Sequence, residues 1–137
     1  MKINKEKAII VYNILDKSNL GKCKDEDKIA IVRIMKALKP YANEYDDFLK
    51  DASIKLRPEG FDAIEEKISK GSLLTASERM LLDKYNADVM RCVSQDFNGK
   101  EIEVDFKPLS EDAFNSLIIG NAYKGGEVMA LYDTIGE

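Results

Sequence analysis

Apolar side chains recur at alternating spacings of four and three residues through the second quarter of the chain. The positions are Ile31, Met35, Leu38, Ala42, Tyr45, Leu49, Ala52 and Leu56. This spacing places all of them on one face of an α-helix and continues for nearly four heptads. We therefore expect a fold built around one long helix, because so long an apolar face needs an extended surface to pack against.

A proline lies inside this pattern. Pro40 would normally break or kink a helix, at a cost of about 3 kcal/mol. A break would reset the phase of the apolar positions, yet the phase is the same on both sides of Pro40. The proline also falls opposite the apolar face, where a kink bends a helix around a core. The sequence therefore predicts one long bent helix, from about residue 26 to 57, ended by Arg57-Pro58-Glu59-Gly60.

The apolar face of the long helix has two interpretations. It forms either the internal core of a monomeric bundle or the interface of a homodimer. Ala42, Tyr45 and Ala52 are unlike the residues of an optimised zipper. Long amphipathic helices in small bundles pack on their own chain. We favour the internal core and keep the homodimer as the alternative; the oligomeric state is not fixed by the sequence.

Shorter helices are expected before and after the long one. Asn4 caps the first, which extends to about Lys17. The pattern Thr75-Ala-Ser-Glu78 is a capping box that begins a helix over about 76–95. The other expected helices are a short one with Phe61, Ile64 and Ile68 closed by Gly71, one from Glu111 to Ile119 capped by Ser110 and ended by Gly120, and a last one over about 126–135.

Acidic and apolar residues alternate after the turn signal Asn98-Gly99. The acids are Glu101, Glu103 and Asp105, and the apolar residues between them are Ile102, Val104 and Phe106. Successive side chains of a strand point to opposite faces, so we expect a strand over 101–107 with the acids facing water. A hairpin with the preceding segment would place Asp96 opposite Glu101, so we favour helix up to the turn. The sequence does not identify the strand's partner.

These segments together predict a mainly α fold, a small helical bundle with one short β element near 101–107. At this length the chain is most simply a single domain, 1–137. Hydrophobic residues make up 45% and charged residues 34%, as in ordinary globular proteins. We identify neither a membrane-spanning run nor a signal peptide, and expect a cytoplasmic protein that does not contact membranes.

The composition restricts the chemistry. The chain has no histidine and only two cysteines, Cys23 and Cys92, far apart in the sequence. Imidazole-based triads, histidine-ligated metals and paired-cysteine zinc or redox motifs are therefore excluded. We expect no catalytic residues, no metal ligands and no cofactor.

The three alternating acids could still be a site. As carboxylate ligands they would serve a metal enzyme acting on phosphate esters, together with acids on the helices. One strand, however, supplies acids along a line and not around a point. We therefore assign Glu101, Glu103 and Asp105 to the solvent-facing side of a strand, and they are the residues that we expect to contact a partner.

The charge distribution suggests another alternative. Residues 1–40 hold ten basic residues against five acidic ones, whereas the remainder is acidic and the net charge is −4. The bases from Lys2 to Lys39 could bind nucleic acid. They are scattered, and most have no aromatic residue among them. Nucleic acid is therefore the second alternative, after the metal enzyme.

The whole pattern resembles the small uncharacterised helical proteins encoded among phage and prophage genes. The resemblance rests on the Met-Lys-Ile opening, the first helix, the long heptad helix, the segment "EIEVDFKPLSE" and the terminal "GEVMALYDTIG". It implies no catalytic residue. We expect a non-enzymatic interaction or accessory protein that acts through a protein-binding surface.

Overall fold

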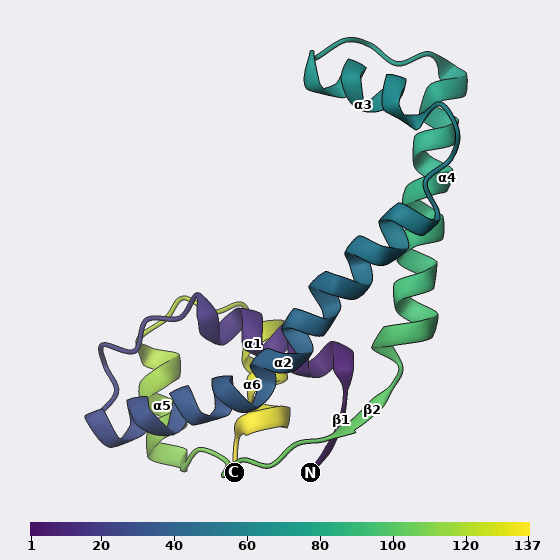
Figure 1. Ribbon diagram of the computed structural model, residues 1–137. Coiled ribbons are helices and arrows are strands. Elements are labelled where there is room, and N and C mark those ends of the chain that lie inside the picture. The colour runs from purple at the N-terminus through teal and green to yellow at the C-terminus, as the bar shows by residue number, and fades with distance from the viewer. The chain divides into compact units, whose positions relative to one another are not determined.

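The computed structural model describes all 137 residues and confirms the mainly helical class. Helices account for 69% of the chain, and two short strands form the sheet. In chain order the elements are β1 (Lys2–Asn4), α1 (Lys5–Asp16), α2 (Asp25–Lys55), α3 (Phe61–Ser69), α4 (Ala76–Val93), the π-helix η1 (Ser94–Asn98), β2 (Glu101–Glu103), α5 (Glu111–Ile119) and α6 (Gly125–Ile135) (Figure 1).

Helix α2 is uninterrupted over 31 residues and contains Pro40, as the unbroken apolar phase predicted. Figure 1 draws it as a single unbroken ribbon. The side chain of Pro40 is exposed, which agrees with its place opposite the apolar face. The helix ends at Lys55, two residues earlier than predicted.

The chain forms two compact units. Unit 1 comprises Met1–Tyr45 and Gly99–Glu137, and unit 2 comprises Asp46–Asn98. The boundary falls inside α2, so this helix contributes residues to both. The single domain expected from the chain length stays a prediction, because compactness alone does not make a unit fold independently.

The sheet of unit 1 joins the beginning of the chain to the strand near residue 101. Strands β1 and β2 are antiparallel, with Ile3 opposite Ile102 and Lys2 opposite Glu103. The second pair brings opposite charges together, which favours this register. The predicted strand over 101–107 is therefore shorter, Glu101–Glu103, and its partner is β1.

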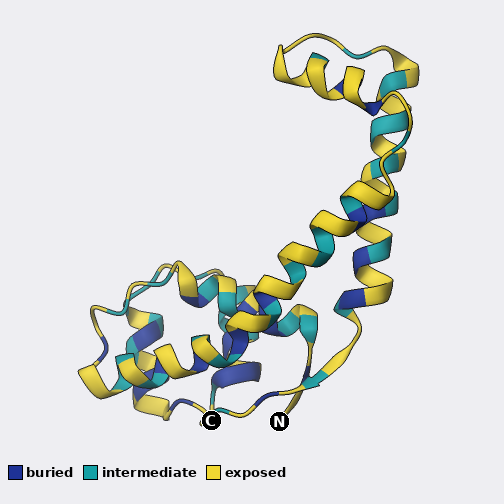
Figure 2. Ribbon diagram, viewed as in Figure 1, coloured by how far each residue is buried: buried dark blue, intermediate teal, exposed yellow.

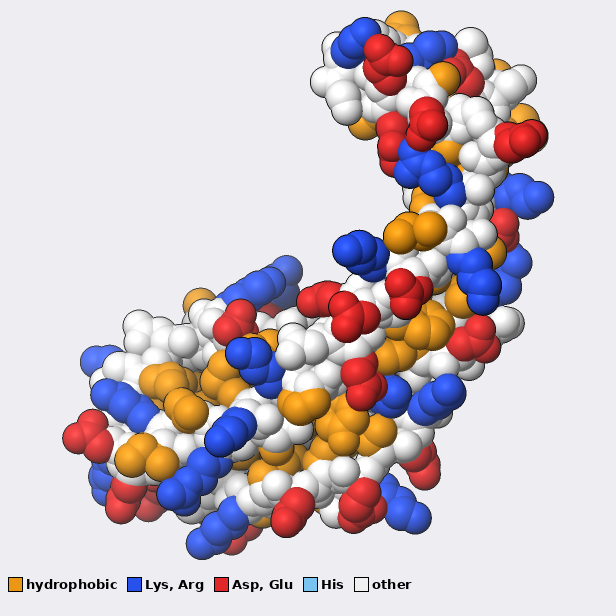
Figure 3. Space-filling model, viewed as in Figure 1, with side chains coloured by type: hydrophobic (Ala, Val, Ile, Leu, Met, Phe, Trp, Pro, Cys, Tyr) orange, Lys and Arg blue, Asp and Glu red, His pale blue; other side chains and the backbone are white.

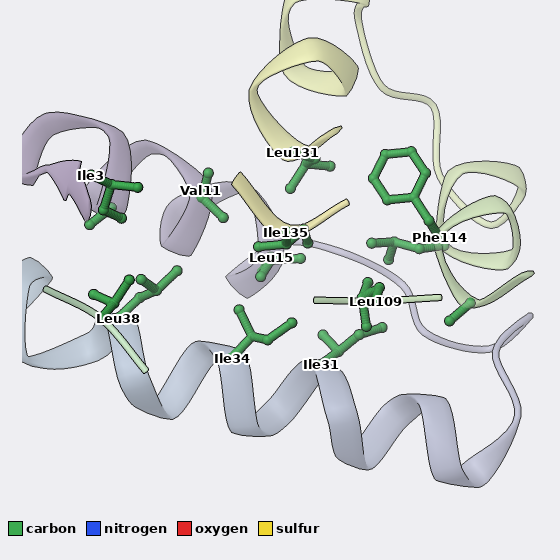
Figure 4. Packing of buried hydrophobic residues seen from close by; sticks show 14 of the residues in the cluster. Ile3, Val11, Leu15, Ile31, Ile34, Leu38, Leu109, Phe114, Leu131 and Ile135 are labelled. Atoms are coloured by element: carbon green, nitrogen blue, oxygen red, sulfur yellow. The ribbon is translucent and has the colours of Figure 1, made fainter. Parts of the chain in front are cut away.

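The core of unit 1 lies against the first half of α2. Ile31, Ile34 and Leu38 of this helix point toward Leu15 and Ile135 and the segment before α5 (Figure 4). Figure 2 shows the same concentration of buried residues. The buried members of the cluster are Ile3, Ala8, Val11, Leu15, Cys23, Ile31, Ile34, Leu38, Val104, Leu109, Ala113, Phe114, Leu117, Leu131 and Ile135. The first half of the apolar face is thus an internal core.

Hydrogen bonds also hold the two loops of unit 1 together. The Asn121 side-chain amide accepts a bond from Asn19 N at 2.7 Å and donates one to Asn19 O at 2.8 Å. The hydroxyls of Ser18 and Tyr123 lie 2.5 Å apart. The loop after α1 is therefore fastened to the loop after α5.

Unit 2 contains α3, α4, η1 and the last third of α2, from Asp46 onward. The rings of Phe61 and Tyr85 lie 4.6 Å apart between centroids, and the Tyr85 hydroxyl donates to Ser53 O at 2.6 Å. Gly60 and Gly71 have φ angles of 78° and 69°, which favour glycine at both ends of α3. The predicted closure of this helix by Gly71 is confirmed.

Three ion pairs hold α3 in place within unit 2. Arg57 binds Asp62 and donates two bonds to the carboxylate of Glu65, at 2.7 and 3.1 Å. Lys67 of α3 reaches Glu78 of α4 at 2.6 Å. The predicted capping box is present, because Thr75 accepts from Glu78 N while Glu78 accepts from Thr75 N.

The end of α4 differs from the prediction of regular helix to about residue 95. The α-helix stops at Val93, and a π-helix continues to Asn98. In an α-helix, residues four apart are rotated slightly past one full turn, so their side chains gradually leave a common face. The wider turn of a π-helix offsets this rotation. Val89, Val93 and Phe97 are consequently all buried, and Phe97 meets the ring of Phe48 at 5.4 Å.

The buried face of α2 yields a stability prediction. Leu38 is fully buried, so Leu38→Ala should lower the free energy of unfolding by about 2–5 kcal/mol through lost transfer energy and a cavity. Val32 lies on the same helix and is 54% exposed, so Val32→Ala should cost less than about 0.5 kcal/mol. Urea unfolding of both variants measures the difference. Equal losses would contradict the orientation of α2.

The Lys67–Glu78 pair yields a pH prediction. The Lys67 ammonium, together with the Thr75 backbone bond, holds the pKa of Glu78 below its ordinary value of 4.5. The folded state therefore binds a proton there less readily than the unfolded state, so the stabilisation is present above that value and is lost as the pH falls. Urea midpoints at about pH 7 and about pH 3 should differ less in Glu78→Gln than in the parent.

The matched control is Glu59→Gln, because Glu59 is exposed and forms no ion pair. Its pH dependence should equal that of the parent. A Glu78→Gln variant that behaves like this control would show that the pair does not contribute.

Candidate functional site

The three alternating acids face water. Glu101, Glu103 and Asp105 are exposed, whereas Val104 is buried and Ile102 and Phe106 are half-buried. The predicted orientation of the segment is therefore confirmed, although only its first three residues are strand. The Glu103 carboxylate accepts a hydrogen bond from the Met1 nitrogen at 2.8 Å. Contact of these acids with a partner stays a prediction.

The structure brings no further acids to the three. No group of three or more acidic or cysteine side chains lies close enough together to hold a metal ion. Glu44 of α2 instead pairs with Lys5 at 3.0 Å. The converging carboxylates that a metal-dependent phosphate-ester enzyme needs are thus not assembled from these side chains.

The two thiols lack the environment of a nucleophile. Burial, reinforced by Asp27, raises the pKa of Cys23. Burial and the bond from its Sγ to Asp96 at 3.6 Å raise the pKa of Cys92. A reactive cysteine needs a lowered pKa, so both side chains are better described as protonated structural thiols.

One base of the N-terminal third lines a small groove in unit 1. Arg33 of α2 and Lys107 flank the half-buried ring of Phe106 around a cavity of about 220 Å³. Asp105 lines the same cavity and offsets one of the positive charges. Lys36 and Lys39 are exposed on α2 nearby in the sequence. The bases thus remain a scattered, partly neutralised surface.

A more apolar groove lies in unit 2, between α2 and α4. Leu49 and Ser53 form one side, and Tyr85, Asn86, Val89 and Met90 form the other, around a cavity of about 320 Å³. We call this the α2–α4 groove. No charged side chain lines it. Such a channel between two helices can take the apolar side of a third helix.

The α2–α4 groove exists because unit 2 covers the predicted apolar face incompletely. Ala52 is buried, but Leu49 is only half-buried, and Met90 is 56% exposed at the groove's edge. The sole large side chains buried in the unit are Phe61, Ile64, Val89, Val93 and Phe97. The heptad pattern therefore continues into a surface that its own chain leaves open.

An unpaired acid lies beside the groove on α2. Asp46 precedes Leu49 by three residues and Ser53 by seven, so it lies on the same side of the helix as these two groove residues. Asp46 is exposed and takes part in no salt bridge. A ligand that carries a positive charge next to its apolar side chains would therefore find a complementary charge here.

Other apolar side chains of unit 2 are also exposed, and Figure 3 shows apolar patches between charged residues. They are Ile54, Leu56, Ile68, Leu73 and Met80. None of them lines the α2–α4 groove. No helix is both long enough and apolar enough to cross a membrane.

Sequence reasoning found one residue of the groove and not the groove itself. Leu49 belongs to the predicted heptad face, whereas for the other side the sequence predicted only a helix over about 76–95. No pattern in the sequence indicated that the Met90 side chain is exposed. Its position relative to α2 depends on the pairing of two helices that the sequence does not specify.

Comparisons with protein-family models, with curated proteins and with solved structures found no match. The function must therefore be argued from the geometry described above.

The orientation of the segment after β2 gives a mutational prediction. Phe106 is half-buried against the core of unit 1, so Phe106→Ala should cost about 2 kcal/mol, less than a fully buried phenylalanine. Glu103→Gln, on the exposed side, should change stability by less than about 0.5 kcal/mol. Denaturant melts of both variants check this. A larger effect at Glu103 would mean that the acids are structural.

Proposed function

We propose that this chain is a non-enzymatic interaction protein that binds an amphipathic helix of another protein in the α2–α4 groove. The observation that carries the proposal is the apolar groove formed by Leu49, Tyr85, Val89 and Met90, which the chain's own side chains leave open. Helix-in-groove recognition uses such surfaces, with apolar anchors at spacings of three and four residues.

The chemistry of the surroundings defines the partner. The groove itself has no charge, while Asp46, on the groove side of α2, has no ion-pair partner. A matching helix therefore carries apolar residues on one side and lysine or arginine beside them. A second copy of this chain is the other occupant to be tested, because the groove includes the α2 face considered above as a dimer interface.

The two alternative functions have less support. A metal enzyme would need carboxylates that converge, and Glu101, Glu103 and Asp105 lie along one exposed line. A nucleic-acid site would use Arg33 and Lys107, but Asp105 lies between them in the same groove. A phage-type accessory role in the cytoplasm agrees with a protein-binding module, and it remains part of the proposal.

The test selects helical peptides from a random display library on the intact protein. Enriched peptides should have apolar residues at spacings of three and four with flanking bases. Met90→Asp should weaken the best peptide at least about ten-fold, or about 1.4 kcal/mol, by calorimetric titration. Met80→Asp is the matched control, because Met80 is 73% exposed on α4 but lies outside the groove.

Two outcomes would contradict this proposal. Equal weakening by Met80→Asp and Met90→Asp would mean that binding does not use the groove. A protein that sediments as a dimer, and becomes monomeric in Met90→Asp, would identify a second copy as the occupant in place of a partner helix.

A further inference from the structure

A second cavity lies in unit 1, apart from the surfaces considered so far. Its volume is about 460 Å³, and Glu111, Phe114, Asn115, Tyr132 and Glu137 line it. We call it the α5–α6 pocket. It contains two aromatic rings, two carboxylates and one amide, and no lysine or arginine.

A backbone bridge brings the walls of the pocket together. Leu109 N donates to Ile135 O at 2.8 Å, and Leu109 forms a parallel bridge with Gly136. Glu111 follows the first bridged residue by two positions, and Glu137 follows the second by one. This main-chain bridge therefore brings both acidic residues to the lining of one pocket, although like charges repel.

The aromatic wall is also held in position. The rings of Phe114 and Tyr132 meet edge to face, with centroids 5.6 Å apart and an angle of 74°. Phe114 is 8% exposed and extends from α5 toward the core (Figure 4), whereas Tyr132 is 58% exposed. A Cβ at position 136 would lie 2.6 Å from Tyr132 O, so the glycine lets the chain pass closely by this tyrosine.

The carboxylates have no partner within the chain. Neither the Glu111 nor the Glu137 side chain forms a salt bridge or a side-chain hydrogen bond within the chain. Glu111 lies in the first turn of α5, where an acid is favoured by the helix dipole. Glu137 has no such reason to be near it. Two uncompensated negative charges thus border one aromatic cavity.

We propose that the α5–α6 pocket binds an organic cation, a primary ammonium or a guanidinium group. Such a group is attracted to the face of an aromatic ring, and carboxylates can bind its N–H donors. The Asn115 side chain supplies an additional oxygen acceptor. Two acids are too few for a divalent ion that prefers six or more oxygen ligands. The cation is either the side chain of a basic peptide or a free amine.

The test titrates n-butylammonium and n-butylguanidinium into the isotopically labelled protein and follows backbone amide resonances. Saturating shifts are expected at Phe114, Asn115, Tyr132 and Gly136, with a Kd on the order of 1 mM for so small a ligand. The neutral analogue n-butanol should give no saturating shifts. Further titrations with a lysine-containing glycine pentapeptide and with spermidine distinguish the two sources by which one binds more tightly.

Matched variants separate the pocket from general electrostatic attraction. Glu111→Gln should weaken n-butylammonium binding about ten-fold, whereas Asp112→Asn should leave it unchanged. Asp112 is exposed in the same turn of α5 and does not line the pocket. Tyr132→Leu should weaken binding about three-fold, and Tyr132→Phe should not, because phenylalanine keeps the ring face.

The proposal is overturned if no cation saturates the protein below about 50 mM, well above the expected affinity. Equal binding of n-butanol, or equal weakening by Asp112→Asn and Glu111→Gln, would also overturn it. The pocket is independent of the α2–α4 groove. Met90→Asp should therefore leave cation binding unchanged, and each proposal can fail alone.

Discussion

The structure depends on burial of apolar side chains along the first part of α2. Ile31, Ile34 and Leu38 are at most 1% exposed, and residues from both ends of the chain cover them. Each such side chain contributes about 1.5–3 kcal/mol relative to exposure. This burial also holds α2 in one register, so that its continuation supplies Leu49 and Ser53 to unit 2. The open groove is therefore a consequence of the same heptad pattern that builds the core.

Most helices could be predicted because their signals are local. Asn4, Thr75 and Ser110 cap their helices with side-chain bonds to nearby backbone, and the apolar phase crossed Pro40 unchanged. Strand β1 was missed because three residues give no periodic signal and their partners are about a hundred positions away. The π-helix was missed because the position of Phe97 is determined by its contact with Phe48, a residue distant in the sequence.

The candidate sites were less accessible to sequence reasoning than the fold. The alternating acids were recognised in the sequence, and their exposure was predicted correctly. Alternation, however, indicates only which face of the strand the acids occupy and not what they bind. The α2–α4 groove and the α5–α6 pocket each combine residues from two helices. Glu111 and Glu137 become neighbours only through the bridge between Leu109 and Gly136. No spacing of residues along the sequence predicts that these two acids line the same pocket.

The division of the chain also determines the order in which it can fold. Unit 2 is one continuous segment, whereas unit 1 is made from two segments separated by the whole of unit 2. Contacts between residues close in sequence form faster, because less loop entropy is lost. On the ribosome, α2 would emerge with only α1 available to cover its apolar face, and unit 1 could close only after α6 had been synthesised. Until then, Ile31, Ile34 and Leu38 would be open to chaperones or to aggregation.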